Sequence, residues 1–242
     1  MQCALCRKDK ELVRSHIIPE FIYEPLYDEK HRFHVLSTHP IRPRPFAQKG
    51  IREKLLCRTC EQHLSKYETY ARKVLFGGVE ITGNETTDGI VLEGINYDNF
   101  KLFQLSILWR ASTSKDRMFC NVDLGPHEET IRNMIKSGNP GAPYEYACIM
   151  VGIRSKGDAA DGLIYQPVKM RMFGHRIYRF IFGGLVWIYF VSSHSLPEFI
   201  KNAVLNEDET VYIPIAKLEN LACLRNFLSD LNKMRRLPDN PS

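Results

Sequence analysis

The sequence has no apolar run long enough to cross a membrane. Its most apolar stretch, residues 177–191, contains Arg179 and the Gly183-Gly184 pair, and it is shorter than the roughly 20 residues that a spanning helix needs. We interpret it as two buried strands joined by a glycine turn. The chain opens with Met-Gln-Cys-Ala-Leu-Cys and lacks the basic and then apolar segments of a signal peptide. We therefore expect a soluble, cytoplasmic protein with no membrane partner.

The sequence also lacks internal repeats, a long low-complexity linker and a strong excess of one charge. Hydrophobic residues make up 44% and charged residues 25% of its 242 residues, a composition that excludes disordered and fibrous proteins. The length suits one large domain, or a small domain fused to a medium one. The net charge of +5 is compatible with a nucleic-acid partner but does not require one.

The seven cysteines do not suggest a disulfide framework, because their number is odd and four of them form two Cys-x-x-Cys pairs. Each such loop can aim both sulfurs at one ion, and two loops complete the tetrahedral site of a structural zinc. The four predicted ligands are Cys3, Cys6, Cys57 and Cys60. The alternative is two unrelated pairs or a redox pair, but neither pair follows a strand of βαβ type. We expect the remaining cysteines to be buried small hydrophobes: Cys120, Cys148 and Cys223.

Hydrophobic periodicity predicts an α+β fold in two parts, residues 1–78 and 79–242. The first part should hold an extended proline-rich loop at 40–45 and a helix that begins after Cys57 and stops at Gly77-Gly78. Further helices are expected at 97–112, after Pro126 and at 217–235. An antiparallel sheet should be built mainly from strands at 144–153, 163–169, 176–182 and 185–192, with short strands or loop at 79–95.

A histidine motif, Arg14-Ser15-His16-Ile17-Ile18-Pro19, lies between the two cysteine pairs. Together with those pairs it resembles the HNH branch of the His-Me finger (ββα-metal) nucleases. In that family a similar His-Ile-x-Pro segment lies on the first strand, and a second Cys-x-x-Cys pair opens the helix. A knuckle, a hairpin and a cysteine pair at a helix N-terminus also form the layout of a treble-clef zinc finger. The resemblance covers about residues 3–75 and implies that residues 1–78 form a zinc-bound nuclease module.

The resemblance implies that His16 is the general base that deprotonates the attacking water. An imidazole suits that role because its pKa lies near neutral pH. In the family a metal-binding residue follows the last cysteine, and here that residue is Glu61, whereas the aspartate that often precedes the histidine is replaced by Ser15. Glu61 would then supply the carboxylate for a catalytic Mg²⁺ or Mn²⁺. Glu68, on the same helical face, is the better further ligand, and His63 the weaker one.

One residue of the family motif is missing. The central asparagine, normally on the second strand just before the second cysteine pair, has no counterpart in Gly50-Ile51-Arg52-Glu53-Lys54. Arg52 or a backbone group would have to hold His16 in its place, or the activity is weakened. Two structural alternatives also stay open: His16 could be structural, and Glu61 could act only through the helix dipole.

Basic residues line the chain that leads into the second cysteine pair. Paired guanidinium donors suit phosphate oxygens, so we expect these side chains to contact the backbone of DNA, or of RNA, without reading its sequence. The residues are Arg42, Arg44, Lys49, Arg52 and Lys54. The alternative is a solvated basic loop with no ligand.

The second part of the chain carries no motif. Its aromatic-rich segment at 178–190 suits a sheet core better than a stacking platform for bases, and the whole part could serve sensing, substrate or partner binding. Three functional hypotheses follow. The first is a metal-dependent DNA endonuclease, and the second is a non-catalytic zinc-finger module that binds nucleic acid or a partner. The third is a restriction or antiviral-defence nuclease controlled by the second part, by a regulatory protein or by a homo-oligomer, an analogy at the level of the fold.

Overall fold

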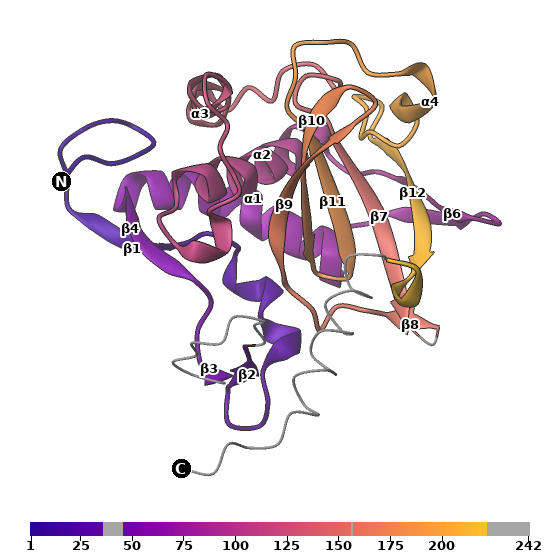
Figure 1. The fold of residues 1–242 in the computed structure, drawn as a ribbon, viewed down its shortest axis with the longest axis horizontal. Helices are drawn as coiled ribbons and strands as arrows, with labels where there is room; N and C mark the ends of the chain where they lie inside the picture. The colour runs from indigo at the N-terminus through magenta and orange to yellow at the C-terminus, as the bar shows by residue number, and fades with distance from the viewer. Residues whose placement is uncertain (36–45, 156, 222–242) are drawn as a thin grey trace.

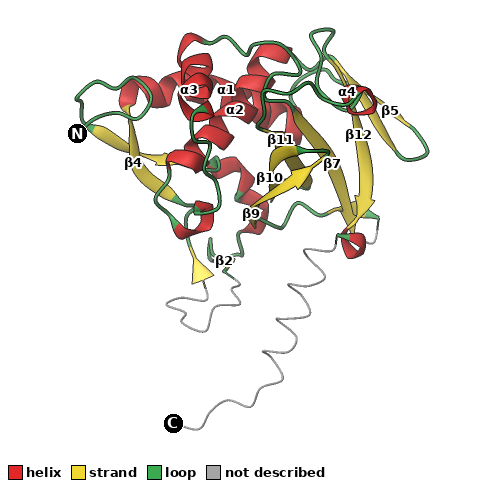
Figure 2. Ribbon diagram, turned by 45° about the horizontal axis from the view of Figure 1, so that its top comes forward, coloured by secondary structure: helices red, strands yellow, loops and turns green. Residues whose placement is uncertain are grey.

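The computed structural model describes residues 1–35, 46–155 and 157–221. The proline-rich loop expected at 40–45, Cys223 and nearly all of the helix expected at 217–235 lie outside these ranges. Two helices, α1 (Arg58–Phe76) and α2 (Tyr97–Thr113), lie between a small N-terminal hairpin and a large sheet (Figures 1 and 2). The predicted α+β class is confirmed, with an antiparallel sheet and a cysteine cluster at the N-terminal end.

The N-terminal hairpin pairs β1 (Leu12–His16) with β4 (Arg52–Cys57), and α1 follows β4 directly. The register shifts between Val13 and Arg14, so that Leu55 has no opposing residue on β1. This bulge leaves the Leu55 carbonyl free to accept a hydrogen bond from the backbone N–H of Ala4. Bulges commonly redirect strands beside functional sites. Here the bulge ties the N-terminal turn with the first cysteine pair to the hairpin.

The segment that connects β1 to β4 begins with two 3₁₀ turns, η1 (Glu20–Ile22) and η2 (Glu24–Leu26). Two very short strands, β2 (Phe33–His34) and β3 (Phe46–Ala47), pair beyond these turns. Pro19 precedes η1 with an extended backbone, ψ 146°, and a proline cannot donate to the β1–β4 ladder. The last backbone bond from this segment to the other strand is that of the Ile17 N–H to the Ile51 carbonyl, and the chain leaves the hairpin after it.

The large sheet has eight strands, ordered β5-β6-β12-β7-β11-β10-β9, with β8 paired to β7. Every pairing is antiparallel except that of β12 with β7. The strands are β5 (Thr82–Glu85), β6 (Gly89–Glu93), β7 (Cys148–Ser155), β8 (Asp158–Ala159), β9 (Tyr165–Met172), β10 (His175–Phe182), β11 (Leu185–Phe190) and β12 (Thr210–Lys217). The sheet is built mainly from residues 144–192, as expected, since β7 to β11 lie in that range. β5 and β6 lie in the region 79–95 where short strands were expected, and β12 adds a further strand.

β12 is the strand that the sequence pattern did not predict. It contains Pro214, and a proline in the middle of a sheet removes a ladder donor. The structure accommodates it by switching partners: residues 210–214 pair with β6, and residues 215–217 pair with β7. The helix expected from Lys217 is also wrong at its start, since Lys217 ends β12 and a 3₁₀ turn, η4 (Leu218–Asn220), follows.

The predicted hairpin at 176–192 is confirmed as β10 and β11. Gly183 and Gly184 form its turn with φ of 58° and 73°, the left-handed conformation that two-residue hairpin turns require. Its large aromatic side chains are buried, which supports the core interpretation over the stacking platform. They are Tyr178, Phe180, Phe182, Trp187, Tyr189 and Phe190.

The predicted helix ends are also close to those observed. α1 stops at Gly77, whose φ is 91°, and α3 (His127–Ser137) starts immediately after Pro126. A short α4 (Glu198–Lys201) precedes β12. One continuous set of buried side chains runs from the cysteine cluster through α1 and α2 to the sheet. Cys148 is buried as expected, but Cys120 is exposed, which corrects its assignment to the core. Among the described residues, no helix combines the length and apolarity needed to cross a membrane.

Candidate metal centre and the residues around His16

The four cysteines of the two pairs meet at one point. Cys3 and Cys6 come from the turn before β1, Cys57 ends β4, and Cys60 lies in the first turn of α1. Their four sulfurs lie within 4.8 Å of one another, and the Sγ atoms of Cys6 and Cys57 are 3.9 Å apart. Tetrahedral zinc with Zn–S bonds of about 2.3 Å sets its sulfurs about 3.8 Å apart. The cluster therefore has the donors and the spacing to hold a structural zinc ion.

Nearby groups suit the negative charge that four thiolates would bring. The backbone N–H of Cys57 donates to Cys3 Sγ at 3.3 Å. Burial raises the pKa of Cys6, but a backbone N–H and the neighbouring cysteines outweigh it and lower the value to about 7. Arg132 of α3 donates to the Leu5 carbonyl between the first two ligands and lies near Cys6. A guanidinium from the second part of the chain thus supports the first cysteine turn.

Ser15 and Glu61 face each other beside the cluster. Ser15 is fully buried, and its hydroxyl donates to Glu61 Oε2 at 2.5 Å. Burial raises the pKa of Glu61, while the Ser15 hydrogen bond and Arg110 oppose that shift. The two positions that the family resemblance assigns to metal binding are therefore neighbours, and the carboxylate that position 15 lacks is present at position 61.

His16 ends β1 and is half-buried, with 22% of its side chain exposed. Its Nε2 lies 2.7 Å from Glu20 Oε2, a close contact outside the alignment of a hydrogen bond. Burial lowers the pKa of His16, and the Arg52 charge adds to this, whereas Glu20 and Glu68 oppose it. Tyr27 in turn donates its hydroxyl to Glu20 Oε1 at 2.5 Å. Burial and the Arg52 charge therefore favour the neutral imidazole.

Glu20 was missed in the sequence. The only signal was its place four residues after His16, and that spacing is informative on a helix but not across Pro19 at the end of a strand. The turn at η1 brings the carboxylate back to the imidazole. Tyr27 was missed for the same reason, because only the folded connection between β1 and β2 places it beside Glu20.

The residue that holds the His16 backbone is Arg110 of α2. Its side chain is 1% exposed, and Nη1 donates to the His16 carbonyl at 2.7 Å and to Glu68 Oε1 at 2.6 Å. Arg52, which the sequence offered for this task as an alternative to a backbone group, lies opposite His16 in the β1–β4 ladder. Nothing in the sequence connects position 110 with position 16, since the contact spans two parts of the chain.

The other predicted metal ligands have partners of their own. Glu68 is paired with Arg110, and His63 lies with Nε2 2.8 Å from the Ile135 carbonyl of α3. Within the described ranges, the four cysteines are the one group of three or more His, Cys, Asp or Glu side chains placed to share a metal ion. Glu61 and Glu68 are not brought together into a second such group.

Of the five predicted nucleic-acid contacts, Arg42 and Arg44 lie outside the described residues. Lys49 and Lys54 are exposed, and Arg52 is half-buried. Lys54 lies directly opposite Arg14, which is also exposed. Among the described acids, none forms an ion pair with Arg14, Arg52 or Lys54. Like charges directly opposite each other on a strand pair are destabilising. The Arg14–Lys54 pair therefore makes this edge of the hairpin basic and lowers its stability.

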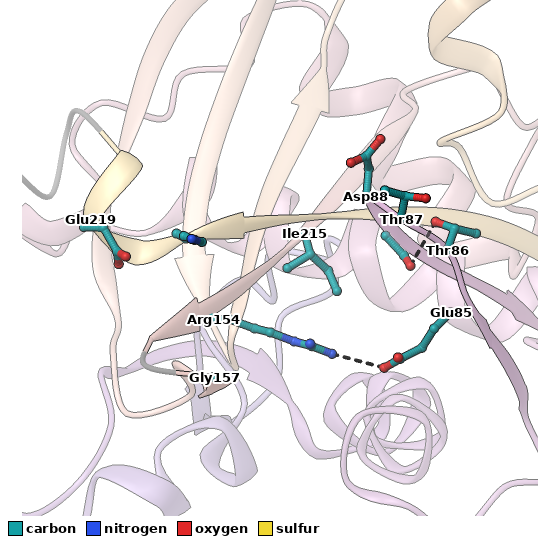
Figure 3. A pocket seen from close by; sticks show the side chains of 10 residues that line it. Glu85, Thr86, Thr87, Asp88, Arg154, Gly157, Ile215 and Glu219 are labelled. Carbon is teal, nitrogen blue, oxygen red and sulfur yellow. Dashed lines mark hydrogen bonds and ion pairs between the residues drawn. The ribbon is translucent and has the colours of Figure 1, made fainter.

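A pocket of about 490 Å³ lies elsewhere, at the end of the large sheet (Figure 3). Its lining mixes charges of both signs, with Arg154 of β7 paired to Glu85 of β5 at 3.3 Å. None of the predicted site residues lines it.

No protein-family model, curated protein or solved structure matches this chain.

Proposed function

We propose that the protein is a metal-dependent endonuclease of HNH type that cleaves DNA, with His16 as the general base. The observation that carries the proposal is the β1–β4–α1 unit, in which a neutral imidazole, the Ser15–Glu61 pair and the cysteine cluster lie on consecutive elements. Zinc at the cysteines would fix the relative position of the hairpin and the helix. The four unpaired thiols suit a reducing compartment, and we propose a cytoplasmic protein.

His16 would take a proton from the attacking water. A base must be unprotonated to act, and a pKa below 6.5 keeps the imidazole neutral near pH 7. Glu20 lies against Nε2, which leaves Nδ1 for the water. Once the proton is transferred, the Glu20 carboxylate stabilises the imidazolium, and Tyr27 holds that carboxylate in place. The proton therefore ends on a ring whose charged form has a counter-ion.

Glu61 and Ser15 would hold the catalytic Mg²⁺ or Mn²⁺. The donor set fits a hard cation, since both groups offer oxygen atoms, but it provides a single carboxylate because Arg110 neutralises Glu68. Mg²⁺ is commonly held by one or two carboxylates, with waters and substrate phosphates as its other ligands. Such an ion would neutralise charge on the scissile phosphate and the leaving oxygen. We therefore propose Glu61, with Glu68 in a supporting role.

The basic edge of the hairpin would bind the phosphate backbone. Arg52 lies beside His16, and Arg14 and Lys54 continue the positive surface along the same strands, with Lys49 just before β4. These cations have no acid partner among the described residues, so phosphates can meet them without displacing an ion pair. Contacts of this kind position the duplex and do not select a sequence.

Cleavage of supercoiled plasmid in Mg²⁺ or Mn²⁺ tests the proposal. Wild-type protein should produce nicked or linear DNA, and His16→Ala should be slower by about 100-fold or more, the usual contribution of a positioned base. His194→Ala is the matched control, because His194 is an exposed imidazole whose partners among the described residues, Ser192 and the His175 ring, lie away from the β1–β4 hairpin. Cleavage rates on single-stranded DNA and on RNA, compared with the rate on plasmid, show which nucleic acid the protein prefers. Equal rates for wild type and His16→Ala would refute the base assignment.

A second candidate function is a zinc-finger module that binds nucleic acid without cutting it. Two observations favour it: Ser15 replaces an expected acid, and the described residues form no second metal-ligand cluster. This hypothesis predicts DNA binding with no cleavage in any metal and no effect of His16→Ala. A third variant, a defence nuclease controlled by a regulatory protein or a second copy, predicts cleavage that appears only when that partner is added.

A further inference from the structure

Arg110 is a buried cation on α2, the helix that packs against both α1 and α3. Its Nε and Nη2 bond the carbonyl and hydroxyl of Ser106, at 3.2 Å and 3.3 Å on its own helix. Those bonds aim Nη1 at α1 and β1, where it donates to Glu68 and to the His16 carbonyl. One guanidinium thereby joins three elements, and its planar shape is what allows several donors to point in fixed directions.

A salt bridge alone does not explain this arrangement. Glu68 offers the charge that a buried arginine needs, yet the same nitrogen that bonds it also bonds a neutral backbone carbonyl. That carbonyl belongs to His16, the last residue of β1. A bond to the carbonyl fixes the peptide plane that follows the His16 Cα, and so restrains the atom from which the side chain projects.

We propose that Arg110 is a positioning residue for His16, so that the site is completed from the second part of the chain. This inference rests on the proposed nuclease function for its kinetic consequence, but the positioning itself is a separate claim. Small displacements of a catalytic group can reduce a rate by about 100-fold. Residues 1–78 would then carry the chemistry, while α2 sets the geometry in which it occurs.

Lys101 provides a matched control on the same helix. It is also a buried basic side chain that donates to backbone carbonyls, those of Ala142 and Pro143. It donates to the Tyr97 hydroxyl on its own helix as well, and burial lowers its pKa to about 7. None of these partners belongs to the N-terminal hairpin, so a change at Lys101 reproduces the loss of a buried donor without touching His16.

The test compares full-length Arg110→Gln, Arg110→Lys, Glu68→Gln and Lys101→Gln. Zinc content and cooperative urea unfolding select folded variants. Cleavage kinetics should show that Arg110→Gln reduces kcat by about 100-fold with KM for DNA little changed. Arg110→Lys should recover part of that loss because it retains one donor and the charge. Glu68→Gln, which leaves an acceptor for Arg110, should lose less than Arg110→Gln. Lys101→Gln should keep the wild-type kcat.

A second readout does not depend on cleavage. The ring ¹H–¹³C signals of His16 should move in Arg110→Gln and stay in place in Lys101→Gln. If the wild type cuts no nucleic acid, the nuclease proposal fails while these signals still decide the positioning claim. If Arg110→Gln leaves both kcat and the His16 signals unchanged, or if Lys101→Gln moves them equally, the positioning claim is overturned. Should Arg110→Gln not fold, Arg110→Lys decides on the same two criteria.

Discussion

Removal of the metal should unfold the first turn of the protein before any other part. Within residues 1–11, Cys3 and Cys6 belong to the cysteine cluster, and Leu5 is an apolar side chain between them. Cys3 and Leu5 are buried. Without the ion, the segment is retained by burial of Cys3 and Leu5, by the Arg132 hydrogen bond to the Leu5 carbonyl, and by the backbone bond from Ala4 to the Leu55 carbonyl. Most of its other residues are exposed.

The magnitudes decide the outcome. Burial of one leucine contributes about 2–3 kcal/mol, and a hydrogen bond from a charged donor contributes about 1.5–3 kcal/mol. Fixing the backbone of about ten residues costs roughly 10–20 kcal/mol in conformational entropy. A structural zinc site supplies about 10–16 kcal/mol in small zinc domains, which is sufficient to close this gap. The segment should therefore be ordered only with metal, whereas β10 and β11 depend on the aromatic core and should remain folded.

Hydrogen–deuterium exchange with and without a zinc chelator measures this directly. The amides that bond within residues 1–11, such as Cys3 N–H to the Lys8 carbonyl, should lose protection on chelation, while β10–β11 amides keep theirs. Cys3→Ser should show the same pattern with no chelator, and Cys120→Ser, at an exposed cysteine, should not. Full protection of residues 1–11 after the metal is removed would refute the reasoning.

Three further predictions concern activity, binding and stability. Burial lowers the pKa of His16 from 6.5, and only the neutral ring acts as a base. The cleavage rate should therefore fall as the pH is lowered, with a midpoint below pH 6.5. A midpoint above pH 7 in a pH–rate profile would contradict this. Replacing Arg14 and Lys54 by Gln should reduce the slope of the logarithm of the DNA-binding constant against the logarithm of the salt concentration by about 1.8. If a salt titration shows an unchanged slope, neither residue belongs to the interface. Trp187→Ala should reduce the free energy of unfolding by about 3–5 kcal/mol, since Trp187 is fully buried and stacked on Phe182; a loss under about 1 kcal/mol in urea would argue against this packing.

Local features of the fold were predictable because neighbouring residues determine them. The glycine pairs that end α1 and turn β10 into β11 are required by backbone conformation alone, and both were located correctly. The cysteine cluster was predictable because the spacing within each pair restricts how its sulfurs can point. β12 was not predictable in this way, since Pro214 is tolerated only where the strand changes partners.

The residues of the candidate site also differ in whether a local pattern or a tertiary contact identifies them. Ser15, His16 and Glu61 could be selected from the sequence because the two cysteine pairs and the segment around His16 resemble the HNH motif, which is a local pattern. Glu20 and Arg110 could not, because their contacts with His16 depend on a turn and on helix packing. Arg52, one of the two alternatives offered for holding His16, does lie opposite it in the β1–β4 ladder.

The central claim is that His16 acts as a base in the cleavage of DNA. The most direct test measures single-turnover cleavage and DNA binding on the same zinc-loaded samples of wild type and His16→Ala. The account predicts cleavage by the wild type, a loss of about 100-fold or more in the variant, and binding that changes by less than about 3-fold. Cleavage by His16→Ala at the wild-type rate would contradict it.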